Sequence, residues 1–470
     1  MGIVSYGSYL PACRLDRTNI GKALGAPAGK GTRAVASYDE DTTTMGVEAA
    51  RIALASAPAG WQPSMVLFAT SNPAYLDKTN ATAIHAALGL DRSIAAYDMV
   101  GSVRSAIGAV RAGAPQGALV ILSDIRTGLP GSADEAQGGD GAVAFCYAND
   151  GSITEQVSAA STTSEFLDRW RIPGETSKQW EERFGERAYV PLAEEAVTDA
   201  LKQAGITADA IDHLIVAGVH PRAARVVAGS IGVRPEAIVD DLSGVIGNTG
   251  AAHGGIVLTD LLDRAEPNKL ILLVALADGA DASVIRTTDA LASYRAAKTV
   301  RQQLDGPTID VPYPTFLTWR GQLHREPPRR PDPERPAAPV SYRREDWKFG
   351  FAGSRCEACG TRHLPPARVC VKCNAVDQMQ EERLADLQGT IATFTVDRLA
   401  FSLSPPVVAA VIDFDGGGRF QCGMTDVDPA TVKIGDRVEM TFRLVYTADS
   451  IHNYFWKARP VAGNTTERNA

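Results

Sequence analysis

The sequence lacks a long apolar segment and any excess of basic charge. Its longest purely apolar runs, such as residues 270–277, have eight residues, whereas a bilayer-spanning helix needs about 20. Residues 1–6 have neither the basic start nor the apolar stretch of a secretory signal. With 47 basic and 55 acidic residues, the net charge is -8, which does not favour nucleic acid or anionic membranes as partners. We therefore expect a cytoplasmic protein that binds neither.

Cysteine is also scarce, with seven residues in a chain of 470. Seven unevenly placed cysteines do not make a disulfide scaffold. Cys13, Cys146 and Cys422 are isolated and are expected to be inert, whereas the other four cluster between positions 356 and 373. Hydrophobic residues at 45% and charged residues at 22% are typical of a globular chain. At about 100–200 residues per domain, the length predicts two to four domains.

Residues 1–289 alternate helical and strand patterns, and they do so twice. The matched pairs, offset by about 148 residues, are the helices 43–56 and 191–205 and the strands 65–70 and 213–219. Solenoid units are about 20–50 residues long, so this period is too long for a solenoid. We predict an α/β fold, a duplicated thiolase-like αβαβα core with halves at 1–160 and 161–289.

A segment rich in proline and arginine follows at 290–346. Five prolines fall within residues 326–336 alone. Proline removes backbone donors and favours extended conformations. We therefore predict a linker without regular helices that lies on the surface of the neighbouring domains.

The strongest chemical signal is a pair of CxxC motifs. Cys356 and Cys359 form the first, and Cys370 and Cys373 form the second. Two such knuckles direct four thiolates at one ion, which suits tetrahedral Zn²⁺ and leaves no open coordination position. The zinc is therefore expected to be structural, in a ribbon at 347–380. His363 lies between the knuckles and is expected to be a bystander.

Residues 381–462 contain short alternating runs that predict an all-β barrel. The expected strands are 389–397, 407–414, 419–424 and 438–446. Their number and length fit a small OB-type barrel. Such barrels often bind oligonucleotides, but acids and bases balance here and aromatic and basic residues are not interleaved, so nucleic acid is not expected.

Several motifs carry a resemblance to known families. Residues 139–142 (GDGA), His220-Pro221 and residues 246–250 (IGNTG) make the region 1–289 similar to the thiolase superfamily, nearest the branch of 3-hydroxy-3-methylglutaryl-CoA synthases. The region from position 347 resembles the zinc-ribbon/OB-fold domains that associate with thiolase-type enzymes. The resemblance implies a coenzyme A thioester as substrate. It also implies a homodimer, or a complex with another thiolase-like protein, through a central strand that we expect at 119–123.

The resemblance assigns catalytic roles to residues of the second half. His220 corresponds to the family histidine that polarises a thioester oxygen or moves a proton. Asn248 corresponds to the asparagine that completes an oxyanion hole. His253 is expected to face the same cavity, and Tyr97 or Tyr189 are possible assistants.

At two other family positions, this sequence lacks the catalytic side chain that the resemblance leads one to expect. The nucleophilic cysteine falls on Val103, or on Ser102 if the alignment shifts by one residue, and neither side chain forms a thiolate. The acidic residue expected after the strand 65–70 is absent, because residues 69–73 (ATSNP) contain no carboxylate.

We therefore predict an acyl-CoA enzyme that makes or breaks a C–C bond without an acyl-cysteine. The first hypothesis is an aldolase or lyase, because aldol chemistry requires an oxyanion hole and proton transfer but no acyl-enzyme. The second is a condensing acyltransferase of the 3-hydroxy-3-methylglutaryl-CoA synthase type, which would need another nucleophile. The third is a non-catalytic scaffold that binds acyl-CoA or a partner subunit.

Overall fold

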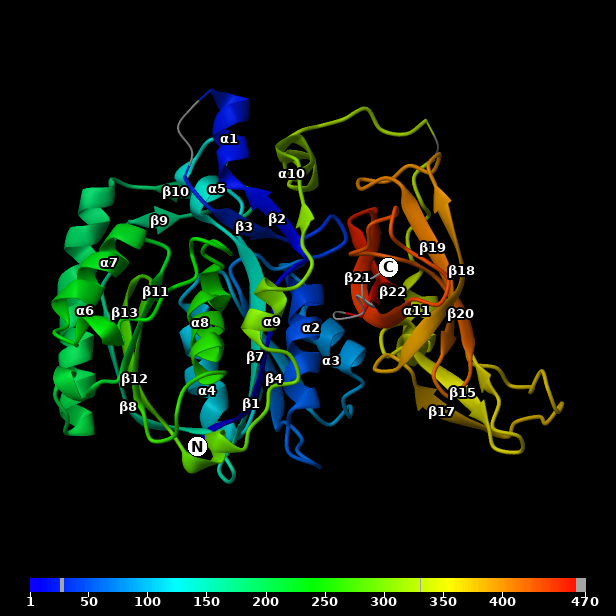
Figure 1. Ribbon diagram of the computed structural model, residues 1–470, viewed down its shortest axis with the longest axis horizontal. Coiled ribbons are helices and arrows are strands. Elements are labelled where there is room, and N and C mark those ends of the chain that lie inside the picture. Colours follow the sequence, from blue (N-terminus) through cyan, green and yellow to red (C-terminus); the bar gives the residue numbers. More distant parts are fainter. Residues whose placement is uncertain (26–28, 330, 462–470) are drawn as a thin grey trace, which may run out of the picture.

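The computed structural model describes residues 1–25, 29–329 and 331–461. The first part of the chain has five layers, seen edge-on in Figure 1. One sheet lies between the outer helices α6 (Glu182–Ala204) and α7 (Pro221–Ser230) and the central helices α4 (Ser105–Gly113) and α8 (His253–Leu262). A second sheet separates the central helices from α2 (Thr42–Ala55) and α3 (Ala81–Leu88). The predicted αβαβα arrangement is confirmed.

The two sheets repeat one topology. The first has the order β1-β7-β6-β4-β5, with β4 parallel to β5 and β6 and with β7 antiparallel to β1 and β6. The second has the order β8-β13-β12-β11, with the same pattern of directions. The strand bounds are β1 Gly2–Tyr9, β4 Met65–Thr70, β5 Ala95–Val100, β6 Leu119–Ile125, β7 Asp140–Ala148, β8 Thr154–Thr163, β11 His213–Gly218, β12 Leu270–Leu276 and β13 Gly279–Thr287. This shared order is what a duplication predicts.

Local sequence signals correctly indicate the first residue of α2, but they indicate the wrong first residue for α6. A capping box starts α2, because Asp41 Oδ1 accepts from the Thr44 amide at 2.8 Å and Thr44 Oγ1 accepts from the Asp41 amide at 2.8 Å. The sequence pattern predicts that helix α6 begins at Pro191, a favoured first position. It begins instead at Glu182, because its buried face continues upstream through Gly185 and Tyr189 and outweighs the hydrogen bond that proline removes.

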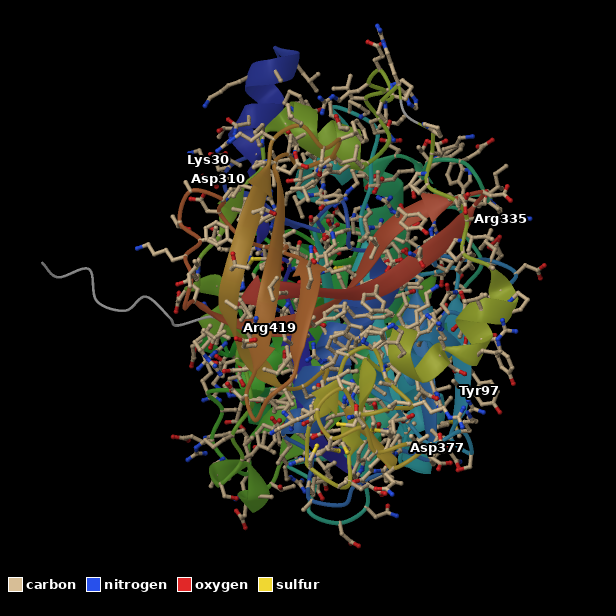
Figure 2. The ribbon with its side chains drawn as sticks, turned by 90° about the vertical axis from the view of Figure 1, so that its right-hand side faces the viewer. Lys30, Tyr97, Asp310, Arg335, Asp377 and Arg419 are labelled. Atoms are coloured by element: carbon tan, nitrogen blue, oxygen red, sulfur yellow. The ribbon has the colours of Figure 1, made fainter. Side chains whose placement is uncertain are left out.

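The strand expected to mediate dimerisation is in the wrong place for that role. Residues 119–123 belong to β6, which pairs with β4 on one side and β7 on the other and therefore has no free edge. Among the described residues, the sheet ends in β1 on one side and in β5 on the other. The outward side of β5 is the edge of interest here. Tyr97 of β5 is 55% exposed and projects from the molecular surface in Figure 2.

The segment 290–346 contains short helices, so the prediction of a linker without regular helices is wrong. They are α9 (Val300–Leu304), α10 (Tyr313–Trp319), α11 (Ala338–Arg343) and α12 (Glu345–Lys348). In α10 and α11 the proline falls in the first turn, where its missing N–H costs nothing. The segment lies on the surface as expected, since Trp319 Nε1 donates to the Leu403 carbonyl of the barrel at 3.0 Å. A small sheet joins it to the N-terminal part of the chain through β14 (Ile309–Asp310), β2 (Cys13–Asp16) and β3 (Thr32–Val35).

The ribbon and the barrel follow. The ribbon has the order β16-β15-β17, with β15 Ala352–Cys356, β16 Arg362–His363 and β17 Met379–Arg383. The barrel sheet has the order β20-β19-β18-β21-β22, with β18 Gln388–Asp397, β19 Val407–Phe414, β20 Arg419–Gly423, β21 Arg437–Ala448 and β22 Ile451–Pro460. A bridge from Met424 to Ala458 connects the end of β20 to β22 across the opening. Residue 462, the expected end of the barrel, lies outside the described residues.

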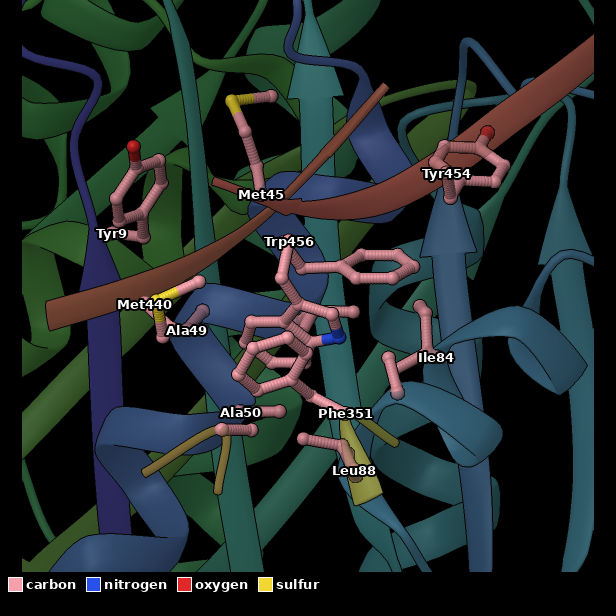
Figure 3. Close-up of a cluster of buried hydrophobic side chains, with 14 of the residues drawn as sticks. Tyr9, Met45, Ala49, Ala50, Ile84, Leu88, Phe351, Met440, Tyr454 and Trp456 are labelled. Atoms are coloured by element: carbon pink, nitrogen blue, oxygen red, sulfur yellow. The ribbon is translucent and has the colours of Figure 1, made fainter. Parts of the chain in front are cut away.

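The barrel packs directly against α2 of the core. Figure 3 shows Trp456 of β22 among Ala49, Ala50 and Phe351, in one apolar cluster that contains residues of both domains. Buried ion pairs surround this cluster. They join Arg443 to Glu40, Lys457 to Asp39 and Arg459 to Glu48, with barrel cations on core carboxylates.

Among the described residues, no helix combines the length and the apolar character that spanning a bilayer demands.

Candidate active site

His220 follows the carboxyl end of β11 and begins helix α7. Its Nδ1 accepts the Ala223 amide at 3.0 Å, and Pro221 occupies the first helical turn. An Nδ1 that accepts from an N–H leaves the ring proton on Nε2. Nε2 lies 3.0 Å from the Glu182 carbonyl, to which it therefore donates. The ring is 1% exposed and is held as a hydrogen-bond donor.

Two polar side chains pack against this histidine. Asp168 and the His220 ring both face Gly185 of α6, and the Tyr189 ring centroid lies 6.1 Å from that of His220. Burial raises the pKa of Asp168, and the nearby His220 opposes that shift. Tyr189 therefore lies beside His220, whereas Tyr97 lies on the exposed edge strand.

The Gly185 position offers a sensitive test of this packing. An added Cβ would lie 2.5 Å from both Asp168 Oδ1 and His220 Cδ2, so Gly185→Ala should displace the histidine and cost about 1–3 kcal/mol of stability through overpacking. We expect turnover to fall more than the melting temperature implies. Gly229→Ala in α7 is the matched control, because its added Cβ would point into open space beside the helix. Equal activity of both variants would contradict this role for the His220 environment.

Asn248 fixes a turn against the end of β11. Its Nδ2 donates to the Gly218 carbonyl at 2.7 Å, and its Oδ1 accepts the Gly250 amide at 2.9 Å. Gly218 precedes His220 by two residues, so the fold brings the two predicted residues together. His253 is buried and its Nδ1 accepts from the Thr249 amide at 3.3 Å, while burial lowers its pKa. The His253 ring therefore stabilises the turn that carries Asn248 by bonding to its backbone.

Val103 lies in the turn before the central helix α4. It lines a cavity of about 110 Å³ together with Gly218 and Gly250, the two residues to which the Asn248 side chain is bonded. The next residue, Arg104, joins the two halves by donating to Asp281 at 3.0 Å. A valine therefore faces the space beside the Asn248 turn. A larger cavity of about 1490 Å³ lies between the barrel and residues 331–348 and contains none of the predicted site residues.

The sequence reasoning missed a polar cluster at the carboxyl ends of β4 and β6. It consists of Ser71, Asp124 and Arg126, which contact one another. The available signal was their position at the carboxyl ends of buried strands or directly after them, where α/β proteins place their ligands.

A short strap connects this cluster to His220. Asp168 packs near the histidine, Arg169 pairs with Asp134 at 2.6 Å, and Arg171 donates to the Ser71 carbonyl. Four consecutive residues span about 10 Å. The segment 168–171 therefore contacts both halves of the core, with its first residue near His220 and its last residue bonded to Ser71.

The four ribbon cysteines converge as a metal site requires. Their sulfur atoms all lie within 4.8 Å of one another, and the pairs Cys356–Cys373 and Cys359–Cys370 are 3.6 Å apart. Tetrahedral Zn²⁺ with Zn–S bonds of about 2.3 Å requires separations of about 3.8 Å. The donor set therefore fits zinc. His363 does not join this set among the described residues, because its Nε2 accepts the Val371 amide at 3.2 Å.

Comparison with known proteins identifies the three parts of the chain. Residues 201–286 match the C-terminal domain of 3-oxoacyl-[acyl-carrier-protein] synthase III, residues 350–380 the rubredoxin-like zinc ribbon of ChsH2, and residues 381–443 the C-terminal OB-fold domain of ChsH2. A hydroxymethylglutaryl-CoA synthase of Aeropyrum pernix is 31% identical over 346 residues, covering 68% of this chain and 94% of its own. The chain belongs to the hydroxymethylglutaryl-CoA synthase family. The Pyrococcus furiosus synthase is 30% identical over 293 residues, covering 60% of this chain and 84% of its own.

Solved structures share the fold of this synthase-family core. MvaS in complex with 3-hydroxy-3-methylglutaryl coenzyme A superposes with a TM-score of 0.59 at 19% identity, covering 81% of this chain and 98% of its own. A hydroxymethylglutaryl-CoA synthase complexed with CoA has a TM-score of 0.57 at 17% identity, covering 67% and 89%. Within the hydroxymethylglutaryl-CoA synthase family, this chain is thus a thiolase-like core fused to a zinc ribbon and an OB barrel.

Proposed function

We propose that this member of the family makes or breaks a C–C bond of an acyl-CoA by aldol or retro-aldol chemistry, without a covalent acyl-enzyme. The observation that carries the proposal is Val103 beside the Asn248 turn, where the resemblance places the nucleophilic cysteine. A valine cannot form a thioester. An aldol step needs only that an enolate be stabilised and a proton be moved.

His220 and Asn248 supply the donors for such an enolate. His220 Nε2–H donates to the Glu182 carbonyl and Asn248 Nδ2–H donates to the Gly218 carbonyl. A thioester oxygen that replaces either carbonyl would receive the corresponding hydrogen bond. Donors of this kind stabilise negative charge as it develops in the transition state.

The substrate class follows from the family and from the cavity. Relatives have been solved with CoA and with 3-hydroxy-3-methylglutaryl coenzyme A, and we propose a CoA thioester here as well. The apolar cavity next to Val103 is small, at about 110 Å³. A short acyl group is the kind of substrate that it would accept.

The decisive variant is His220→Ala. Loss of one oxyanion donor typically costs about 100- to 1000-fold in turnover, and we expect a loss of that size in acetyl-CoA release from short 3-hydroxyacyl-CoA probes, followed by mass spectrometry. His213→Ala is the control, because His213 begins the same strand at its opposite end. Unchanged turnover in His220→Ala would rule out the role proposed for this residue.

The condensing acyltransferase is the second candidate, and it is favoured by the name of the relatives. It needs a nucleophile other than Val103. Intact mass measured after incubation with acetyl-CoA separates the two reactions: an acetyl group retained on the protein supports condensation, and its absence during turnover supports the aldol type. Tight CoA binding without any turnover would instead indicate a scaffold.

We further propose a homodimer, or a complex with another thiolase-like protein, formed through β5. Its outer edge, which pairs with no other strand of the described ranges, and the exposed ring of Tyr97 support this choice. An unpaired strand edge presents N–H and C=O groups that a second strand can bind.

A further inference from the structure

A buried carboxylate lies at the centre of the missed cluster. Asp124, at the end of β6, is 0% exposed. Both of its oxygens lie 2.8 Å from Ser71 Oγ, Oδ1 accepts the Ser71 amide at 3.2 Å and Oδ2 accepts the Ala251 amide at 3.0 Å. Burial outweighs these partners and raises the pKa of Asp124. A carboxylate with a raised pKa is a stronger base than a solvated one.

The cluster of Ser71, Asp124 and Arg126 lies between the turn that carries Val103 and the turn that carries Asn248. Thr70 pairs with Val100 in parallel register and its carbonyl accepts the Gly101 amide at 3.1 Å, which places Ser71 beside the turn that carries Val103. On the other side, the backbone of Gly250 presses against Asp124, since an added Cβ would lie 2.1 Å from Oδ2. With φ of +57°, this position also favours glycine.

Ser71 Oγ accepts one hydrogen bond and donates another. Arg126 Nη1 donates to Ser71 Oγ at 3.3 Å, so the hydroxyl proton is free to point at Asp124. The Arg126 guanidinium also lies 4.0 Å from Asp124 Oδ2. A cation next to the serine oxygen stabilises that oxygen when its proton moves toward the carboxylate.

This arrangement supplies a carboxylate where the sequence lacks one. The resemblance expects an acid directly after β4, and Ser71 stands in that stretch. The side chain of Asp124, from the neighbouring parallel strand, meets the serine hydroxyl there. His220 is held as a donor by its two backbone partners, so a group that accepts protons is still needed for an aldol step.

We propose that Ser71 is a catalytic residue that transfers the proton in this reaction, with Asp124 as its acceptor and Arg126 as its positioning residue. The inference rests on the proposed function. In the retro-aldol direction, Ser71 Oγ takes the proton of the substrate 3-hydroxyl while its own proton passes to Asp124. The Cα–Cβ bond then breaks to give a carbonyl product and a CoA enolate. The same relay returns one proton to Cα, so no other reactant is consumed.

The test separates proton transfer from binding. Acetyl-CoA is the probe: exchange of its α-protons in D₂O is followed by NMR, and its binding by calorimetry. We expect Ser71→Ala and Asp124→Asn to lower the exchange rate by about 100-fold or more, the range of general acid–base catalysis, with binding retained. Ser71→Thr, which keeps the hydroxyl, should recover part of the rate.

Ser123→Ala is the matched control, because its hydroxyl is buried on the same strand next to Asp124 and has no partner among the described residues. It should exchange like the wild type. The relay would be overturned if Ser71→Ala kept the exchange rate of the wild type, or if it lost exchange and acetyl-CoA binding together. In either case, His220→Ala would still test the proposed function separately. A wild type with neither exchange nor turnover would instead overturn the proposed function, and the relay with it.

Discussion

Removal of the zinc is expected to unfold the ribbon while the five-layered core keeps its structure. The ribbon strands are short, and Cys356 and Cys370 are among its few fully buried side chains. A module of this size has little apolar core to hold it together. In zinc-finger peptides the metal contributes about 10–16 kcal/mol, which is the folding free energy of the module.

Cys370→Ser is the variant that tests this expectation. Its sulfur accepts the Lys372 and Cys373 amides at 3.4 and 3.5 Å, so the knuckle is organised around it. We expect about one zinc per wild-type chain, as a site of four thiolates implies, and much less in the variant, with amide exchange across residues 352–383 no longer protected. Cys422→Ser, whose sulfur lies in the barrel outside the metal group, should keep the zinc. Ribbon amides that stay protected after chelation would show that the metal does not hold the fold.

Arg443→Ala is expected to lower the free energy of unfolding by about 3–5 kcal/mol, the usual cost of breaking a buried ion pair. The Arg443 side chain is 1% exposed and pairs with Glu40 of the core and Asp426 of the barrel. Its removal leaves two carboxylates without their cation in the interface. Arg419→Ala is the control, since the Arg419–Asp413 pair lies on the surface of the barrel, where ion pairs contribute little.

The pH dependence gives a second readout of the same variant. Burial already raises the pKa of Glu40, and Arg443 opposes that shift. Without the arginine, the pKa of Glu40 should rise further, so the folded variant holds a proton that the unfolded chain releases. A raised pKa in the folded state costs stability as the pH increases. The defect measured by urea unfolding should therefore be larger at neutral pH than near the ordinary pKa of a glutamate, and an equal loss at both would contradict it.

Patterns within one segment were enough to predict much of this molecule. The repeated helix–strand units, the paired CxxC motifs and the barrel strands are local in sequence, and the structure confirms the fold that they indicate. His220 and Asn248 are assigned to one candidate site through the family resemblance, and in the structure the Asn248 side chain bonds to Gly218, two residues before His220. The position of His220 at the start of a helix also has a local signal, because Pro221 directly after it favours the first helical position.

Contacts between distant segments could not be predicted in this way. Ser71 and Asp124 meet only because β4 and β6 are adjacent and parallel, a register that no local pattern specifies. Glu40 and Glu48 look like solvated charges in sequence, yet both are buried against arginines about 400 positions downstream. A charged side chain usually indicates an exposed position, and for these two residues the docked barrel reverses that expectation.

The position of β22 has a consequence for how the protein is made. The strand that contributes Trp456 and Arg459 to the interface with α2 ends at Pro460, so it leaves the ribosome about 400 residues after that helix. At about 5–20 residues per second, the core carboxylates stay hydrated for tens of seconds before their partners arrive. Synthesis from the N-terminus therefore yields a thiolase-like core whose α2 face is completed last, and a chain truncated before β22 would expose that face to chaperones and proteases.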